Sequence, residues 1–447
     1  MHDIALERLA EHTMPGAAFD SSAEESPSRC HSGTRHYIMN DVHSWFNTRP
    51  RNKNMLWISG PAGVGKTAIM RSVADVESRY KRLGATIFFS RANKRDDPAQ
   101  FVPTLIYQLA VGIPSYQEFL KDQMTADPQL LLKGSKALFG RLIVEPFGHQ
   151  KICDGMDPLL ILIDGLDECD GGEHTQRGIV EMISNFVQQF PGSPLVWVIA
   201  SRPEPWLWAT FLRVEHNCRR EYIAIDAEEA QKDVELYLRD EFATMRKDRP
   251  DLIPYNRQWP SELQIRCIFR AASGLFVFAS TVIRFVRDPN VANPVGQLLI
   301  VLAAIENLGF SSQSGNPLSI LHDLYVRILK AMSRPTYAQV TKRILGCCDL
   351  LPRNTFHPTT FMLSCNFLGI EQHAAYAALQ KLHSVLDIPS QNEAATREIR
   401  VLHASFTDFL RNHKGSREYH VGRPESGADI VRSSFRILQE ANKSSEC

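Results

Sequence analysis

The segment Gly60–Thr67, GPAGVGKT, matches the pattern G-x-x-x-x-G-K-[ST] at every fixed position. Glycines in such a loop let backbone N–H groups surround phosphate oxygens, and the helix that follows adds its positive N-terminal end. The pattern assigns Lys66 to the β- and γ-phosphates and Thr67 to Mg²⁺. An ordinary glycine-rich turn is the alternative. The predicted phosphate-binding set is Gly60, Pro61, Ala62, Gly63, Val64, Gly65, Lys66, Thr67 and Ala68.

A second candidate set follows the apolar run 159–163. Asp164 ends this run, and an acid at the end of a buried strand needs a partner or a function, so we expect it to join Thr67 as a Mg²⁺ ligand. Asp167 and Glu168 are candidates to polarise an attacking water. Gly165 is expected to leave room for a metal or a phosphate. The alternatives are a capping role for the first acid and a solvated loop for the other two.

Arg202 follows a third apolar run, 195–200. If this run is a strand of an open α/β sheet, the arginine lies at the carboxyl edge, where ligands of such sheets bind. A guanidinium is always charged and offers a fork of donors that suits phosphate. We therefore predict that Arg202 senses the γ-phosphate. The alternative is a surface ion pair with Glu204.

These candidates require a scaffold of buried strands. Short apolar runs without polar alternation, which are typical of strands covered on both faces, occur at 55–59, 85–90, 159–164, 195–200 and 222–225. Helical patterns lie between them. Alternation of strands and helices predicts an α/β fold with a parallel, doubly wound sheet.

Beyond residue 226 strand signals nearly vanish and helical periodicity dominates. The predicted organisation is an N-terminal lead-in that is loop-rich over 13–35, a nucleotide-binding domain, an all-helical domain, a small α+β module and a C-terminal tail. Their ranges are 1–35, 36–226, 227–334, 335–423 and 424–447.

The composition excludes several classes of protein. With 44% hydrophobic and 22% charged residues, the 447-residue chain is not a disordered, collagenous or coiled-coil protein. Fifty Lys and Arg balance fifty Asp and Glu, so no overall basic field is available for nucleic acid or an anionic membrane. Nine cysteines without a Cys-x-x-Cys pair favour a reducing compartment. We expect a cytoplasmic protein with no targeting signal and no nucleic-acid or membrane partner.

At these motifs the chain resembles the NACHT class of signal-transducing (STAND) P-loop ATPases, particularly nephrocystin-type and heterokaryon-incompatibility NACHT proteins. The resemblance is carried by GPAGVGKT at 60–67, LLILIDGLDE at 159–168 and VIASRP at 198–203, with weaker matches in CHSGTR at 30–35 and LHASFTDFL at 402–410. In the segment 30–35, Ser32 replaces the usual proline of the family. The resemblance implies that residues 335–423 form a winged-helix-like module.

The same resemblance implies roles for three further residues. Thr34 and Arg35 would lie beside the adenine, and His403 would contact the β-phosphate of ADP. Residue type alone favours other roles: a helix N-cap for Thr34, a surface charge for Arg35 and a hydrogen-bonded core residue for His403.

For function, the resemblance implies an ATP/ADP-binding switch with slow Mg²⁺-dependent hydrolysis, used in signalling or non-self recognition, with a homo-oligomer in the ATP state. Such proteins usually carry an effector module before the ATPase and a repeat array after it. Neither is expected here, so unknown protein partners would supply sensing or output. Two alternatives remain open: a nucleotide-binding adaptor or decoy with little or no hydrolysis, and a P-loop phosphotransferase.

Overall fold

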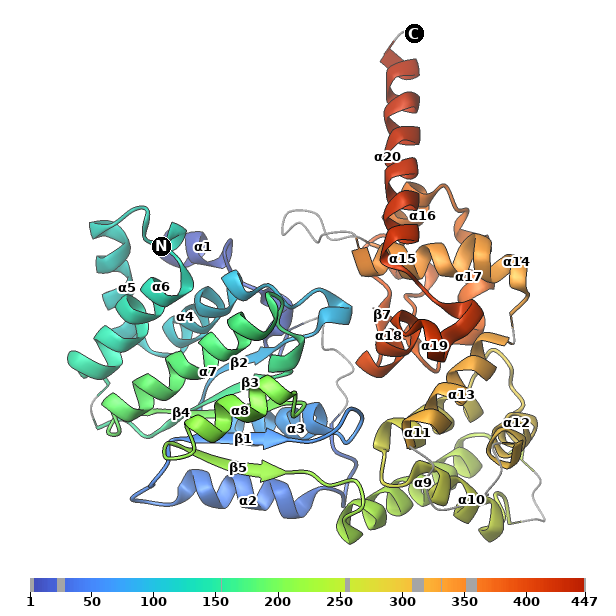
Figure 1. The fold of residues 1–447 in the computed structure, drawn as a ribbon, viewed down its shortest axis with the longest axis horizontal. Coiled ribbons are helices and arrows are strands. Elements are labelled where there is room, and N and C mark those ends of the chain that lie inside the picture. The colour runs from blue at the N-terminus through green and yellow to red at the C-terminus, as the bar shows by residue number, and fades with distance from the viewer. Residues whose placement is uncertain are drawn as a thin grey trace. The chain divides into compact units, whose positions relative to one another are not determined.

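The structure is a computed structural model of the chain. It describes residues 4–21, 29–153, 155–253, 258–307, 317–330, 332–350 and 360–445. The chain divides into two compact units (Figure 1). The first comprises 1–91 and 95–227, and the second comprises 92–94 and 228–447. No helix in the described ranges is both long and apolar enough to span a membrane.

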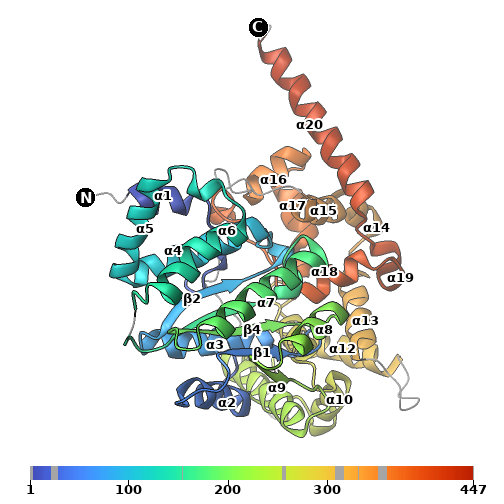
Figure 2. The same cartoon turned by 60° about the vertical axis from the view of Figure 1, so that its left-hand side comes forward.

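A five-stranded sheet forms the centre of the first unit (Figure 2). All of its paired strands are parallel, and their order is β2-β3-β4-β1-β5. The strands are β1 (Met55–Ser59), β2 (Leu83–Phe88), β3 (Leu159–Asp164), β4 (Leu195–Ser201) and β5 (Cys218–Tyr222). Every residue of β1, β3 and β4 is buried, as expected for strands covered on both faces.

Helices cover both faces of this sheet. One face, which includes Trp57, Ile161 and Trp197, shares a hydrophobic core with α4, α7 and α8. Helix α3 packs on β2, β3 and β4, and its buried side chains lie outside that core. The helices of the unit are α1 (Ile4–Ala10), α2 (His36–Asn47), α3 (Lys66–Arg79), α4 (Phe101–Gly112), α5 (Pro114–Ala126), α6 (Ser135–Phe139), α7 (Gly172–Gln189) and α8 (Pro205–Arg213). The predicted α/β fold with a parallel, doubly wound sheet is confirmed.

The last strand differs from its prediction. The apolar run 222–225 is not the strand; β5 ends at Tyr222 and begins at Cys218. As the edge strand it pairs only with β1, and after the buried Cys218 its residues alternate between partly buried and exposed. Its sequence, CRREY, is therefore mostly polar, which a search for apolar runs does not detect.

The N-terminal residues belong to the first unit rather than forming a lead-in outside it. Helix α1 lies in the predicted lead-in, ahead of its loop-rich stretch 13–35. Leu9, Met14 and Ala17 are buried in the same core as α4, and the Met14 N–H donates to the Thr104 hydroxyl at 2.8 Å. Burial of these apolar side chains explains why the segment folds onto the sheet domain. Residues 1–3 and 22–28 of the predicted lead-in lie outside the described residues.

The second unit is mainly helical, which confirms the predicted helical region after the sheet. Its first part contains α9 (Glu228–Asp248), α10 (Glu262–Ala272), α11 (Phe276–Val286), α12 (Pro294–Asn307) and α13 (Pro317–Lys330). Its second part contains α14 (Arg334–Thr336), α15 (Lys342–Leu350), α16 (Phe361–Leu368), α17 (Gln372–Leu379), α18 (Ala404–Arg411) and α19 (His413–Ser416), with an antiparallel pair of β6 (Leu386–Asp387) and β7 (Arg400–Val401). Both parts belong to one compact unit.

The predicted C-terminal tail is a helix, α20 (Arg423–Ser445). It packs on α15 and α16, where Arg343 pairs with Asp429 at 2.7 Å and Arg436 donates to two carbonyl groups at the end of α16. Beyond this contact α20 extends past the other helices of its unit (Figure 1). Residues 446 and 447 lie outside the described residues.

Candidate phosphate-binding site

The loop 60–65 joins the end of β1 to the start of α3. Gly63 and Gly65 have φ values of 81° and 93°, in the left-handed region that favours glycine. A side chain at Gly60 would lie 3.0 Å from the Ile223 carbonyl oxygen. Because Gly65 is the N-cap of α3, no side chain there occupies the first N–H groups of the helix. The loop therefore has the backbone geometry of an anion site at a helix N-terminus.

Lys66 folds back over this loop. Its ammonium donates to the carbonyl oxygens of Gly60 at 2.7 Å and Pro61 at 2.9 Å. Burial lowers the pKa of Lys66 to about 8, the negative charge of Asp167 raises it, and the charge of Arg202 lowers it. The Lys66 ammonium is desolvated, and its two partners are neutral carbonyls. An anion bound in the loop would therefore stabilise its positive charge.

Asp164 lies at the end of β3 and is buried. Burial raises its pKa to about 6, while a hydrogen bond from the Thr67 hydroxyl and the charges of Arg71 and Lys66 lower it. The two predicted Mg²⁺ ligands are therefore in contact across α3 and β3. Hard oxygen ligands suit Mg²⁺, which usually keeps several waters and takes only one or two protein carboxylates. The residues present fit a Mg²⁺ ion bound together with phosphate.

The expectation that Gly165 leaves room for a metal or phosphate is wrong. Gly165 has a φ of 70°, and a Cβ atom there would lie 2.8 Å from the Phe89 carbonyl oxygen. Phe89 in turn donates its N–H to the Asp164 carbonyl at 2.9 Å. Glycine is needed because the chain after β2 passes closely over this turn, and the space beside it is filled by backbone.

Asp167 binds Arg202 rather than lying in a solvated loop. The Arg202 N–H donates to Asp167 Oδ1 at 2.9 Å, and the Arg202 Nε lies 3.3 Å from Oδ2. The Asp167 side chain is only 8% exposed. Arg202 thus pairs with this acid from the turn after β3, whereas the alternative was a surface ion pair with Glu204.

Glu168, in the same turn, is bound by Arg91. Its Oε2 accepts the Arg91 N–H at 3.0 Å, and the Arg91 guanidinium donates to the Asp167 carbonyl at 3.0 Å. Each candidate for water activation therefore already accepts a hydrogen bond from a backbone N–H in this structure.

Besides Arg91, two further residues near the site were not predicted. Arg71 lies one helical turn after Thr67 on α3, so its charge reaches Asp164. Gln176 on α7 is 1% exposed and binds the carbonyls of Asp167 and Cys169. The sequence did carry a signal for it. A polar residue at 176 continues the apolar stripe 179, 183 and 186, and a buried amide must find hydrogen-bond partners.

The N-terminal pair does not occupy the positions that residue type favours. Thr34 is buried, and its hydroxyl donates to the His31 carbonyl at 2.7 Å. The N-cap of α2 is Arg35, so Thr34 is not the N-cap. Arg35 is not a surface charge either, because it is 2% exposed and donates to the Val64 carbonyl at 2.7 Å. Arg35 thus supports the phosphate loop, and the adenine role of both residues stays a prediction.

His403 lies in the second unit, at the N-cap of α18. Its Nε2 is 3.0 Å from a guanidinium nitrogen of Arg284 and 3.4 Å from the Ser280 hydroxyl, both on α11. Burial and the charge of Arg284 lower the pKa of His403 to about 3. The histidine is therefore neutral and accepts from Arg284 in this structure. Its contact with the β-phosphate stays a prediction.

The depressed pKa predicts how stability depends on pH. Below about 6.5 the unfolded chain takes up a proton at this histidine, while the folded chain does not until about pH 3. Stability is therefore lost as pH falls through this window, by up to about 1.4 kcal/mol per pH unit. Urea denaturation at pH 7 and pH 5 should show a smaller loss for His403→Gln than for the wild type. The exposed His373, replaced in the same way, is the control. Equal losses in all three proteins would contradict the contact.

Comparison with known proteins adds a family match over the site. The family model described as "Nephrocystin 3, N-terminal" matches residues 33–202, a range that holds β1 to β4 and the whole phosphate loop. No curated protein matches the chain. Among solved structures, the crystal structure of Cdc6p from Pyrobaculum aerophilum is similar, with 10% sequence identity and a TM-score of 0.37. That match covers 86% of this chain and 96% of the other.

Proposed function

We propose that this P-loop NTPase-like protein is an ATP/ADP-binding molecular switch of the NACHT type, with slow Mg²⁺-dependent hydrolysis. The observation that carries the proposal is the desolvated Lys66 ammonium, held over the phosphate loop at the N-terminus of α3. This positive charge, the glycine backbone and the Thr67–Asp164 pair form a site for a phosphate chain with a divalent cation.

Each residue has a separate role in this proposal. Lys66 and the first N–H groups of α3 bind the β- and γ-phosphates. Thr67 and Asp164 hold Mg²⁺, which when bound neutralises charge on the phosphate oxygens. A carboxylate of Asp167 or Glu168 accepts the proton of the attacking water. The oxygen of this water bonds to the γ-phosphorus while the bond between the γ-phosphorus and the β,γ-bridging oxygen breaks. The products are ADP and phosphate.

The hydrogen bonds of the two acids support slow turnover. Asp167 accepts from the Arg202 N–H and Glu168 from the Arg91 N–H. In the proposal, one of these carboxylates gives up its bond within the protein to accept a proton from water, and this exchange limits the rate. This favours a switch over a P-loop phosphotransferase, and it also favours the second candidate, a nucleotide-binding adaptor or decoy that does not hydrolyse ATP.

The switch proposal includes the partners that the sequence resemblance implies. In it, ATP favours a homo-oligomer, and other proteins supply the signal and the output in signalling or non-self recognition. Sizing of the protein in ADP and in a non-hydrolysable ATP analogue tests the oligomer directly.

Nucleotide binding is tested by stripping the protein of any bound nucleotide and adding ATP with Mg²⁺. A ligand at 100 times its Kd stabilises the folded state by about 2.7 kcal/mol, so we expect a clear rise in Tm. Adenosine, which lacks phosphates, should give a much smaller rise. Mass spectrometry of the nucleotide released from freshly purified, denatured protein should identify ADP or ATP. A Tm that is unchanged by ATP with Mg²⁺ would overturn the proposal.

A further inference from the structure

We infer that Gln176 is a positioning residue for the proposed hydrolysis, because it ties the turn that carries Asp167 to the segment that carries Arg202. The catalytic consequence rests on the proposed function. The geometric part does not, since all of its contacts lie within the first unit and are made without nucleotide.

The side-chain amide of Gln176 uses both its donor and its acceptor ends. Nε2 donates to the Asp167 carbonyl at 3.1 Å and to the Cys169 carbonyl at 2.9 Å. Oε1 accepts the indole N–H of Trp206 at 2.8 Å. A primary amide has two N–H donors and one carbonyl acceptor, so these three contacts satisfy it. A fully satisfied buried amide fixes the positions of its neighbours, because any shift leaves a desolvated polar group.

These bonds close a ring with the acid and the arginine. Asp167 presents its backbone carbonyl to Gln176 and its carboxylate to Arg202. Arg202 leads through a short turn into α8, where Trp206 returns to Gln176. Gln176 is thus the point at which the turn after β3 and the segment after β4 share one buried side chain.

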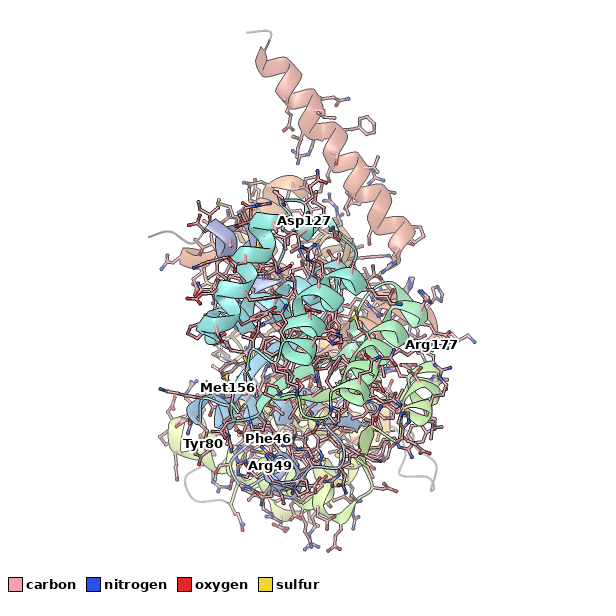
Figure 3. All side chains as sticks on the ribbon, turned by 90° about the vertical axis from the view of Figure 1, so that its left-hand side faces the viewer. Phe46, Arg49, Tyr80, Asp127, Met156 and Arg177 are labelled. Atoms are coloured by element: carbon pink, nitrogen blue, oxygen red, sulfur yellow. The ribbon has the colours of Figure 1, made fainter. Side chains whose placement is uncertain are left out.

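The neighbouring residue on α7 has a different environment. Arg177 lies at the outer surface of α7 (Figure 3) and pairs with Glu173 at 2.7 Å, as surface residues one turn apart do. The ring predicts that movement of Arg202 towards a phosphate displaces both Trp206 and Asp167. Without the Gln176 amide, the turn that carries Asp167 and the segment that carries Arg202 are no longer joined through one buried side chain.

The decisive variant is Gln176→Met, which keeps the length of the side chain and removes all three hydrogen bonds. Gln188→Met is the matched control, because Gln188 is exposed on the same helix. The Arg202 amide reports the geometry directly, since its N–H is donated to Asp167. In nucleotide-free protein, we expect hydrogen exchange at this amide to be at least about tenfold faster in Gln176→Met and unchanged in the control. Unchanged exchange in both overturns the inference, whatever the protein does with ATP.

Steady-state ATP hydrolysis tests the catalytic consequence. We expect Gln176→Met to lower kcat about tenfold with KM for ATP within about twofold, because Lys66 and the phosphate loop are untouched. A change in KM alone, or an equal loss in the control, contradicts the positioning role. If the wild-type protein hydrolyses no ATP, the proposed hydrolysis fails while the exchange result still decides the geometry.

A second variant keeps the test valid if Gln176→Met does not fold. Trp206→Phe retains an aromatic ring and removes the indole N–H, so exchange at the Arg202 amide should also accelerate. The double variant should be no worse than the more severe single variant, because both changes break the same ring. Fully additive effects would overturn the inference.

Discussion

Lys66→Ala is expected to lower ATP affinity by about a hundredfold or more, since hydrogen bonds to charged groups contribute roughly 1.5–3 kcal/mol each and this ammonium would bind two phosphates. Isothermal titration with ATP and Mg²⁺ gives the change in Kd. Protein purified without added nucleotide should carry none. The nucleotide-free variant should unfold at the same temperature as the wild type or above it, because a desolvated charge has been removed.

Lys53→Ala is the matched control for this experiment. Lys53 also donates to backbone carbonyls, those of Glu215 and Cys218, but it precedes β1, whereas Lys66 follows the other end of that strand. It should retain wild-type affinity for ATP. Equal losses in the two variants, or wild-type affinity in Lys66→Ala, would mean that the loop is not the phosphate site.

Asp164→Asn is expected to lower kcat by about a hundredfold or more and to remove most of the Mg²⁺ dependence of ATP binding, because electrostatic stabilisation of transferred phosphate is usually the largest catalytic contribution. Asparagine keeps the shape of the side chain and accepts the Thr67 hydrogen bond, but it carries no charge for the cation. The measurement is ATP affinity and turnover as a function of Mg²⁺ concentration, with ATP affinity in the presence of a chelator as the reference.

The control for Asp164→Asn is Asp170→Asn, an exposed acid in the same connection between β3 and α7. It should behave as the wild type in every Mg²⁺ titration. Since burial disfavours the charge of Asp164, the nucleotide-free Asp164→Asn protein should be at least as stable as the wild type. An unchanged Mg²⁺ dependence in this variant would remove Asp164 from the cation site.

The parts of the fold and the site that could be predicted are those specified by neighbouring residues. Glycines at 63 and 65 are needed for the local backbone conformation, so the phosphate loop is recognisable in eight residues. Strands buried on both faces are continuously apolar, which made β3 and β4 visible. The contact of Thr67 with Asp164 followed because parallel strands bring their carboxyl ends to one edge of the sheet.

The parts that could not be predicted depend on residues far apart in the chain. Arg35 is buried where the Val64 carbonyl accepts its hydrogen bond, and the chain at Phe89 passes closely over Gly165. The partner of Arg202 belongs to a different strand connection. Residue type says which groups need partners, but not which partner the tertiary fold supplies.

The strand register also has a consequence for how the protein folds. Ser59 pairs with Ser201, and Asp164 pairs with Ala200, so the ends of β1, β3 and β4 lie at one level although long stretches of chain separate them. Such non-local pairing closes long loops and is slow. The site is therefore complete only in molecules whose sheet has fully assembled. A ligand of this site would therefore bind only molecules with a correctly assembled sheet. Its binding would retard unfolding of the whole sheet rather than of one loop.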